Sequence, residues 1–414
     1  MDYTIDNITN EYNGISSTDY VSFSIKGTEE NGLDKTIVNA IRRTIMSDIP
    51  VVAFRVERDN SDIVVEMNKS SLHNEFILDR ISLIPLSIDP EKYEKKEYLF
   101  KLHVEDEKND KPIKQITAYD FDIYKINDDV RGRDIDVIEL DNYTLLKKND
   151  KDKILNPFKI NYSNKVNTEY CIITELKSNN VSGDLYSDEE LKLYGTPSVS
   201  TAKENAAWSC VSMCIYTFRI DEARLEAVLE EKKTIENITS NIKEFEEEFR
   251  VNEGERYYFL DNMMQPYYYE FTIEKVGFYD PKTIFIKGCE YLLKRINDFK
   301  AQIDLLNIPE CRIKIFESET ISGGYSLIVD GENDTLGSII QSHIVRKYIE
   351  VERDDSPIMF CGYKRLHPLE ERIQFTIKMK TEDTKIIPAF LTTICSELED
   401  IVGQILKESL SKLN

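Results

Sequence analysis

The sequence lacks any long hydrophobic run. A membrane-spanning helix needs roughly 18 uninterrupted apolar residues, and the nearest candidate, residues 206–218, contains Ser209, Ser212 and Thr217. The first residues, Met-Asp-Tyr-Thr-Ile-Asp, also lack the basic start and apolar core of a secretory signal. Together these absences predict an intracellular protein without membrane contact.

Recognisable metal and nucleotide motifs are missing as well. The seven cysteines include no Cys-x-x-Cys pair, so the usual structural zinc patterns are absent and free thiols are expected. His73 and Glu75 form a His-x-Glu, but the Pro-Cys-x-x-Cys that a zinc deaminase also needs does not occur. No Gly-x-x-x-x-Gly-Lys or Gly-x-Gly-x-x-Gly is present. We therefore expect no metal and no cofactor.

Positive charge is in short supply. The chain has 53 Lys+Arg against 76 Asp+Glu, a formal charge of −23, and no run of five basic residues. Such a chain repels phosphate, so DNA and RNA should be reached only through other chains. At 414 residues and 41% hydrophobic content, it is long enough for at least two globular cores.

The first unit along the chain combines strands with a helix. Residues 20–25 alternate like a half-buried strand, and residues 27–32 supply a turn. A helix is predicted next, because one apolar stripe is formed by Leu33, Ile37, Ala40, Ile41 and Ile45. Pro50 ends it. Further elements are predicted as strands over 51–57 and 63–67 and a short helix over 72–81.

The middle of the chain changes character. Residues 90–203 are rich in Asp, Lys, Asn and Tyr with short strand patterns, which indicates an inserted, mostly β domain. Residues 221–256 carry twelve acidic and six basic side chains, and are predicted to be either a solvated helix or a mobile linker.

The last third repeats the opening plan. Strands are predicted near 313–316, 325–329, 358–364 and 372–379. Between the two pairs, residues 334–340 are predicted to open a helix that Asp334 or Thr335 can cap. Long apolar stripes run along residues 282–306 and 387–405. Each copy alone would leave such a stripe in water, at about 25 cal/mol for each Å² of apolar surface. The two copies are therefore expected to pack on each other.

Two motifs of the first copy carry a family resemblance. Residues 39–50, Asn-Ala-Ile-Arg-Arg-Thr-Ile-Met-Ser-Asp-Ile-Pro, closely resemble the signature helix of the α-like assembly subunits of DNA-directed RNA polymerases. Residues 72–86 resemble the second signature at the expected distance. Residues 203–208 and 273–277 are similar to the end of the inserted domain and the return strand of the larger, third-subunit type.

The carboxy-terminal copy resembles the small eleventh-subunit type. The matching segments, again in order, are residues 333–337 and 362–369. The resemblance implies an α+β fold, an intramolecular pseudo-dimer of two α-like dimerisation domains, the first interrupted by a mostly β insertion. The implied boundaries are 1–89 with 216–308 for the first domain (220–262 an acidic linker), 90–215 for the insertion and 309–414 for the second domain.

The resemblance also implies a role without catalysis. The expected partners are the largest and second-largest polymerase subunits, with a small tenth-subunit-like zinc-binding subunit. Joining both types in one chain is similar to the arrangement in some large cytoplasmic DNA viruses, which places the protein in host cytoplasm and virion if viral, and otherwise in the nucleus. Unlike many third-subunit relatives, the insertion has no four-cysteine zinc loop, since no cysteine precedes Cys171.

Candidate interface residues fall into two groups. The face for the large subunits is assigned to Arg42, Arg43, Glu75 and Arg80, because guanidinium groups pair well with carboxylates; Glu75 and Arg80 are also candidates for a local ion pair. The internal pseudo-dimer interface is assigned to Ile37, Ile41, Ile45, Leu293, Ile296, Leu336, Ile340, Phe390, Ile394, Leu398 and Ile401.

Two other functions stay open at this point. One is a free-standing dimerisation scaffold. The other is a hydrolase or transferase that uses carboxylates of the insertion, such as Glu169, Glu175 and Asp184, although no spacing supports it.

Overall fold

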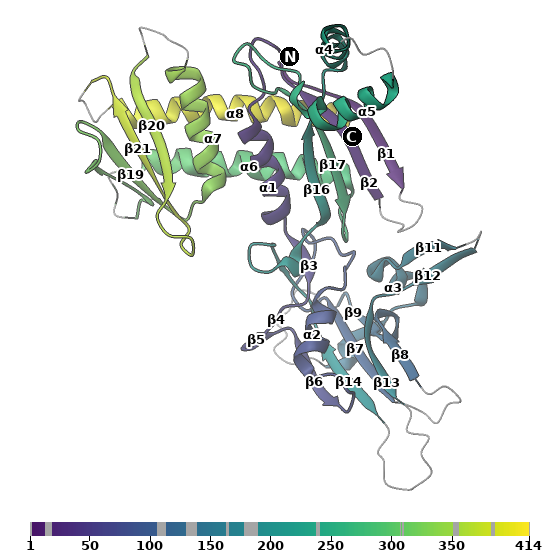
Figure 1. Cartoon of the computed structure of the whole chain (residues 1–414). Coiled ribbons are helices and arrows are strands. Elements are labelled where there is room, and N and C mark those ends of the chain that lie inside the picture. The colour runs from purple at the N-terminus through teal and green to yellow at the C-terminus, as the bar shows by residue number, and fades with distance from the viewer. Residues whose placement is uncertain are drawn as a thin grey trace.

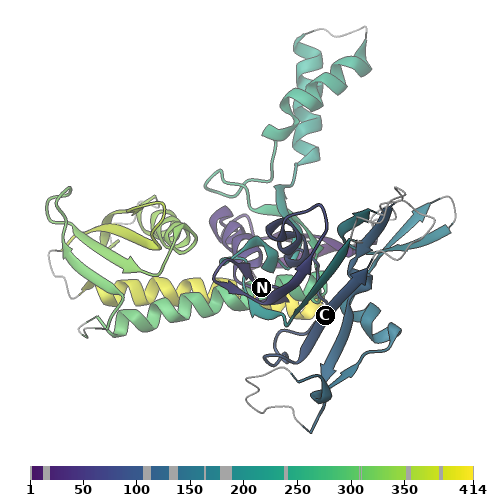
Figure 2. The same cartoon turned by 90° about the horizontal axis from the view of Figure 1, so that it is seen from below.

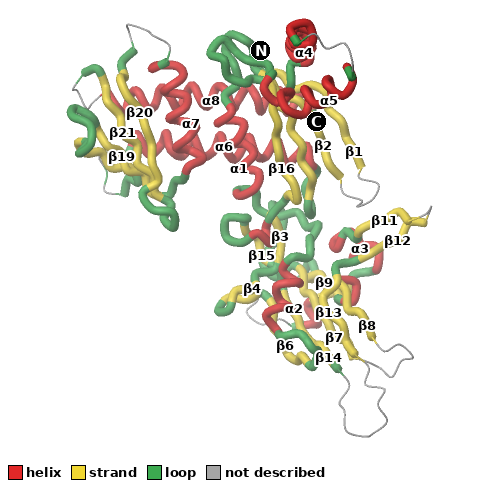
Figure 3. The backbone as a smooth tube through the Cα atoms, in the orientation of Figure 1, coloured by secondary structure: helices red, strands yellow, loops and turns green. Residues whose placement is uncertain are grey.

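The computed structural model shows two helix-and-sheet units side by side, with a strand-rich part extending from one of them (Figure 1). Figure 3 separates these parts by secondary structure. The structure describes residues 2–12, 19–105, 113–129, 139–162, 165–177, 189–236, 241–306, 308, 310–350, 356–381 and 386–413. Within these ranges, no helix is long and apolar enough to cross a bilayer.

The first unit is a four-stranded antiparallel sheet with two helices on one face. The strand order is β1-β2-β17-β16, formed by β1 (Thr4–Tyr12), β2 (Asp19–Lys26), β16 (Val211–Phe218) and β17 (Tyr268–Lys275). Helices α1 (Lys35–Ser47) and α6 (Pro281–Asp304) pack on it. The ring of Phe285 on α6 meets Phe23 and Phe271 of the sheet at centroid distances of 4.7 and 5.3 Å.

The second unit repeats this arrangement. Its sheet order is β18-β19-β21-β20, built from β18 (Ile313–Glu317), β19 (Tyr325–Asp330), β20 (Ile358–Arg365) and β21 (Arg372–Met379). Its helices are α7 (Asp334–Ile344), continued by the π-helix η5 (Val345–Ile349), and α8 (Ile386–Lys412). Both units therefore run strand, strand, helix, strand, strand, long helix, which confirms the α+β class.

Helix starts follow the polar residues that precede them. Asp34 caps α1 by accepting a hydrogen bond from the Thr36 N–H at 2.8 Å, and Asp280 caps α6, whose first residue is proline. The prediction that Asp334 or Thr335 caps α7 was wrong. Asn333 is the cap, because its side chain accepts from the Thr335 N–H at 3.0 Å.

The strand-rich part lies between α1 and β16 in the chain. Its central sheet has the order β10-β9-β7-β14-β6. Its elements are β3 (Val51–Ala53), β4 (Val56–Glu57), β5 (Asn60–Ser61), β6 (Ile63–Asn68), α2 (Asn74–Ser82), β7 (Tyr98–Glu105), β8 (Ile113–Thr117), η1 (Ala118–Asp120), β9 (Asp122–Ile126), η2 (Leu140–Asn142), β10 (Tyr143–Leu145), α3 (Lys148–Leu155), β11 (Phe158–Tyr162), β12 (Lys165–Glu169), β13 (Ile172–Lys177), β14 (Glu190–Gly195), β15 (Ser198–Ser200) and η3 (Ala206–Trp208).

The expected boundaries of the insertion, residues 90 and 215, do not match the packing. Phe54, Ile77 and Ile81 belong to the hydrophobic core of the strand-rich part, and the rings of Phe54 and Phe100 meet at 5.1 Å. At the other end, β16 pairs with β17 from residue 211 onward. Hydrophobic alternation could not show which core residues 52–88 join, because it identifies an apolar face without its partner.

The acidic stretch 221–256 is helical. Helices α4 (Glu222–Ile235) and α5 (Ile242–Glu253), followed by η4 (Gly254–Arg256), form a hairpin that stands away from the body (Figure 2). Leu225, Leu229 and Phe249 give it a small core of its own. Of the two alternatives for this stretch, the solvated helix therefore describes α4 and α5; residues 237–240 lie outside the described residues.

A glycine in α7 lies against an aromatic ring. A Cβ on Gly337 would come within 2.6 Å of Cδ2 of Tyr363, whose hydroxyl lies 2.8 Å from the Ser338 hydroxyl. Gly337→Ala is expected to lower the free energy of unfolding, because overpacking costs about 1–3 kcal/mol against roughly 1 kcal/mol gained in helix propensity.

Gly403 in α8 is the matched control for this prediction, because no heavy atom lies within 4 Å of its added Cβ. Gly403→Ala should therefore raise stability. Urea unfolding followed by circular dichroism measures both changes, and equal shifts in the same direction would contradict the account of Gly337.

Candidate assembly interface

The two units share one hydrophobic core along their long helices. Helices α6 and α8 lie side by side in both views (Figures 1 and 2), and α1 contacts α7. A single cluster of buried residues includes Ile296 of α6 and Leu398 of α8, both fully buried. Burial of such side chains contributes about 1.5–3 kcal/mol each, so the seam accounts for a large share of the stability of the pair.

The structure places the whole predicted internal set in this core. Leu293 and Ile401 are partly buried and pack against it, and the others are buried: Ile37, Ile41, Ile45, Ile296, Leu336, Ile340, Phe390, Ile394 and Leu398. They come from α1, α6, α7 and α8, so all four helices contribute to one continuous apolar interior.

Polar contacts join the units along the same seam. Arg43 Nε of α1 donates to the Thr335 hydroxyl of α7 at 2.9 Å. The Ser342 hydroxyl donates to the second oxygen of the α1 cap, Asp34, at 2.5 Å. Lys300 of α6 and Glu399 of α8 form an ion pair at 2.6 Å. These contacts fix the relative position of helices whose apolar faces alone would allow sliding.

Arg295 is the most buried of these cross-unit links. From α6 its Nε donates to Glu332 at 2.8 Å and its Nη2 to the α7 cap Asn333 at 2.9 Å. The Glu332 side chain is only 5% exposed. Burial raises the pKa of Glu332, and the Arg295 guanidinium opposes that rise. Arg295 therefore lowers the free-energy cost of burying the Glu332 carboxylate where the two units meet.

Glu397 of α8 binds three side chains at the end of α7 and in η5. Its carboxylate accepts hydrogen bonds from His343 and Tyr348, both at 2.7 Å, and pairs with Lys347 at 2.8 Å. Burial acts to raise the pKa of Glu397, but the three hydrogen bonds outweigh it and lower the pKa to about 2. The carboxylate is thus charged at neutral pH and holds η5 against α8.

The four residues assigned to the large-subunit face have different surroundings. Arg42 is half-buried and donates to the Asn39 side chain, one turn earlier on α1, at 3.0 and 3.1 Å. The Arg43 side chain is exposed, but its Nε bonds Thr335 of α7 and so links the two units, a role that the expectation of two equivalent arginines missed. The sequence could not distinguish the two arginines, because both lie beside the apolar stripe of α1.

Glu75 and Arg80 do not pair within the described part of the chain. Arg80 Nη1 donates to the Ile173 carbonyl at 3.0 Å and ties α2 to β13. Glu75 is exposed in the first turn of α2, where the Nδ1 of the cap His73 accepts from its N–H at 3.5 Å. The expected ion pair was therefore wrong, because the Arg80 side chain turns toward the sheet.

Two large apolar side chains that were not predicted as site residues are exposed at α2. Phe76 and Leu83 are 63% and 65% exposed. Met46 of α1, beside Arg42, is 44% exposed.

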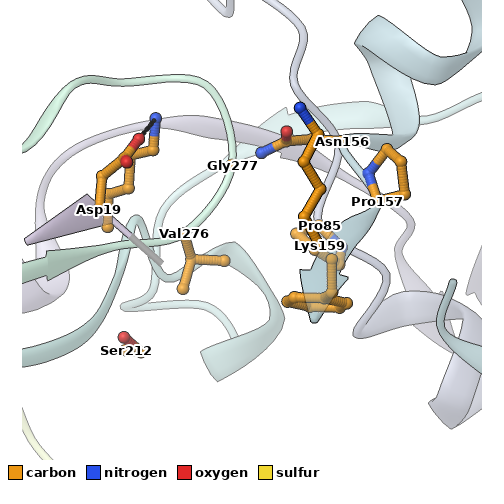
Figure 4. Close-up of a pocket in the computed structure, with 10 residues that line it drawn as sticks. Asp19, Pro85, Asn156, Pro157, Lys159, Ser212, Val276 and Gly277 are labelled. Atoms are coloured by element: carbon orange, nitrogen blue, oxygen red, sulfur yellow. Dashed lines mark ion pairs between the residues drawn. The ribbon is translucent and has the colours of Figure 1, made fainter. Parts of the chain in front are cut away.

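A cavity of about 430 Å³ separates the first unit from the strand-rich part (Figure 4). At one side Asp19 and Lys275 form an ion pair at 2.8 Å. The Ser212 hydroxyl, also in the lining, donates to Glu274 at 2.7 Å. No histidine or cysteine is among the described residues that line the cavity.

The carboxylates considered for hydrolysis do not form a site in the described residues. Glu169 lies on β12, which pairs with β11, and Glu175 lies on β13, which pairs with β8. Asp184 is outside the described residues. Both glutamates are exposed.

One group in the described residues has the donors for a metal ion. His103, Glu105 and Glu190 lie close together on β7 and β14. His103 Nε2 is 3.2 Å from an oxygen of each glutamate, and Lys69 binds the other Glu190 oxygen at 3.1 Å. Lys69 already supplies the positive charge that a cation would bring.

The cysteine side chains are free. Cys210 and Cys214 are buried, and burial raises the pKa of each to about 12. Cys210 Sγ lies 3.4 Å from the Ile45 carbonyl. Thiols held protonated in this way are unreactive, so both cysteines act as inert residues of the core.

Comparisons with known proteins find a matching family model for each of the two units. Residues 28–296 match the family model described as the RNA polymerase Rpb3/Rpb11 dimerisation domain, and residues 325–408 match a second model of the same description. These spans include α1, α7 and most of α6 and α8, the helices that build the seam.

Individual relatives match over shorter stretches. The chain is 36% identical over 69 residues to subunit 3B of DNA-directed RNA polymerases IV and V from Arabidopsis thaliana, covering 17% of this chain and 18% of the relative. It is 30% identical over 119 residues to subunit rpac1 of polymerases I and III from Dictyostelium discoideum, covering 28% and 29%. The matched part thus spans less than a third of these relatives.

Proposed function

Because the chain belongs to the RNA polymerase Rpb3/Rpb11 dimerisation domain family, we propose that it is a non-catalytic assembly subunit of a multisubunit DNA-directed RNA polymerase. The observation that supports this most is the pairing of two such domains in one molecule through α6 and α8. A dimer that forms within one chain needs no second protein, because linkage gives each unit an effective concentration on the order of millimolar.

The proposed partners are the largest and second-largest subunits, with a tenth-subunit-like zinc-binding subunit beside them. In this proposal the first domain is of the third-subunit type and the second of the eleventh-subunit type, fused as in large cytoplasmic DNA viruses. The protein would then act in the host cytoplasm and virion, or in the nucleus if it is not viral. The formal charge of −23 supports nucleic-acid contact through the partners only.

The proposed contacts for a large subunit are Arg42 and Met46 on α1 and, on the strand-rich part, the exposed Phe76 and Leu83. Arg42→Ala with Arg43→Ala is expected to reduce recovery of the two large chains by about tenfold, because it removes charged hydrogen bonds worth roughly 1.5–3 kcal/mol. Affinity purification of the tagged full chain, with quantitation of co-eluting large chains, measures this.

Arg43→Ala alone is the control, because Arg43 bonds Thr335 inside the molecule. The single variant should reduce thermal stability slightly and leave recovery of the large chains nearly unchanged. Undiminished recovery with the double variant would contradict the proposed surface. A lone 48.2 kDa species in native mass measurement of the tagged wild-type protein would instead favour a free-standing scaffold.

A further inference from the structure

The strand β16 has an open edge next to the acidic hairpin. It is the last strand of its sheet, and a groove of about 610 Å³ runs along it. Residues 216–220 form one wall, and Glu222, Glu255 and Tyr258 at the base of the hairpin form the other. The corresponding connection of the second unit, between β20 and β21, spans only residues 366–371, so the hairpin wall belongs to the first unit alone.

The backbone along this groove is suited to pairing with another strand. The Arg219 N–H donates to the Tyr268 carbonyl at 3.0 Å, within the ladder between β16 and β17. Because antiparallel pairs alternate, the N–H and C=O groups of Tyr216 and Phe218 are directed away from β17 toward the open edge. An edge of this kind accepts an extended chain as an added strand.

Aromatic rings line the same groove. Tyr216, Phe218 and Tyr258 are partly buried, and the rings of Phe218 and Tyr258 lie 5.2 Å apart. Faces of such rings attract ammonium and guanidinium groups. Glu255 lines the groove together with Tyr258, and burial and the Glu255 charge raise the pKa of Tyr258.

The lining of the groove is negative. It includes Glu222, Glu255 and Glu270, and Arg219, the cation in the described lining, binds Glu270 at 2.6 Å. Arg250 of the hairpin binds Glu222 at 3.1 Å. Glu255 is exposed and has no ion pair among the described residues. A basic side chain entering beside Tyr258 would therefore meet a carboxylate that has no competing internal partner.

We propose that this groove binds an extended segment of another protein that is rich in lysine or arginine. The segment adds a strand to β16 and places one basic side chain between Glu255 and the rings of Phe218 and Tyr258. An acidic segment is repelled by the same surface. This binding site does not depend on the proposed role in polymerase assembly.

A synthetic peptide that alternates lysine with valine is the probe. Fluorescence anisotropy with the full chain should detect its binding, and Glu255→Lys should weaken it by about tenfold or more through repulsion of the basic side chain. A glutamate–valine peptide of equal length should not bind.

Three controls make the result specific. Glu319→Lys makes the same charge change on an exposed loop of the second unit and should change affinity less than twofold. A lysine–valine peptide N-methylated at alternate residues should lose binding, because it cannot pair with the edge. Circular dichroism should show Glu255→Lys folded.

Failure to bind the lysine–valine peptide, or equal weakening by Glu255→Lys and Glu319→Lys, would overturn the proposal. Undiminished binding of the methylated peptide would overturn strand addition. Recovery of the large subunits with Glu255→Lys is a separate measurement. If the variant loses peptide binding but still recovers the large subunits, or the reverse, the groove and the assembly surface are distinct sites.

Discussion

Leu398→Asp is expected to lower the free energy of unfolding by at least ~4 kcal/mol. Leu398 is fully buried in the core that α6 and α8 share. The substitution removes buried apolar surface and places a carboxylate in the apolar seam between α6 and α8. Because both units contribute to this core, the loss should separate them as well as destabilise α8.

Leu410→Asp is the matched control for this variant, since Leu410 lies on the same helix but is 44% exposed. It should change stability by less than about 0.5 kcal/mol. Urea unfolding followed by circular dichroism, with the fluorescence of the buried Trp208 as a second probe, measures both variants. Equal urea midpoints for Leu398→Asp and the wild type would contradict the packing of Leu398 between α6 and α8.

Arg295→Ala should cost about 3–5 kcal/mol. The variant leaves Glu332 buried without the guanidinium that compensates its charge, and it also removes the hydrogen bond to the Asn333 cap. The loss should be visible as a lower urea midpoint at pH 7.

The double variant Arg295→Ala with Glu332→Gln tests the cause. A neutral amide costs less to bury than a carboxylate, so the double variant should recover part of the stability lost by Arg295→Ala alone.

The pH dependence of Arg295→Ala has a defined sign. Burial raises the pKa of Glu332, and removal of Arg295 takes away a group that opposes the rise. The folded variant then binds a proton more readily than the unfolded chain, so the destabilisation grows as pH rises above the unfolded value of about 4.3. At pH 5 the deficit relative to wild type should be smaller than at pH 7; an equal deficit would show that charge burial is not the cause.

The sequence by itself determined the helices of both units and most of their strands. The apolar stripes over residues 282–306 and 387–405 predicted α6 and α8 because the 3.6-residue period is a local property of the chain. The duplicated order of strands and helices, and the resemblance of residues 39–50 and 333–337, predicted the α+β class. Strands β1 and β16 were missed; β16 lies in an apolar run whose type periodicity cannot settle.

Only the tertiary structure decided which surfaces meet. Arg295 and Glu332 are 37 positions apart, and neither residue's local pattern indicates a buried pair. Likewise, Arg42 and Arg43 are neighbours in sequence, yet only Arg43 reaches Thr335. Periodicity shows which face of an element is apolar, but the partner of that face depends on long-range packing. Long-range packing also decides that residues of the 52–88 stretch join the core of the strand-rich part and that β16 is an edge strand.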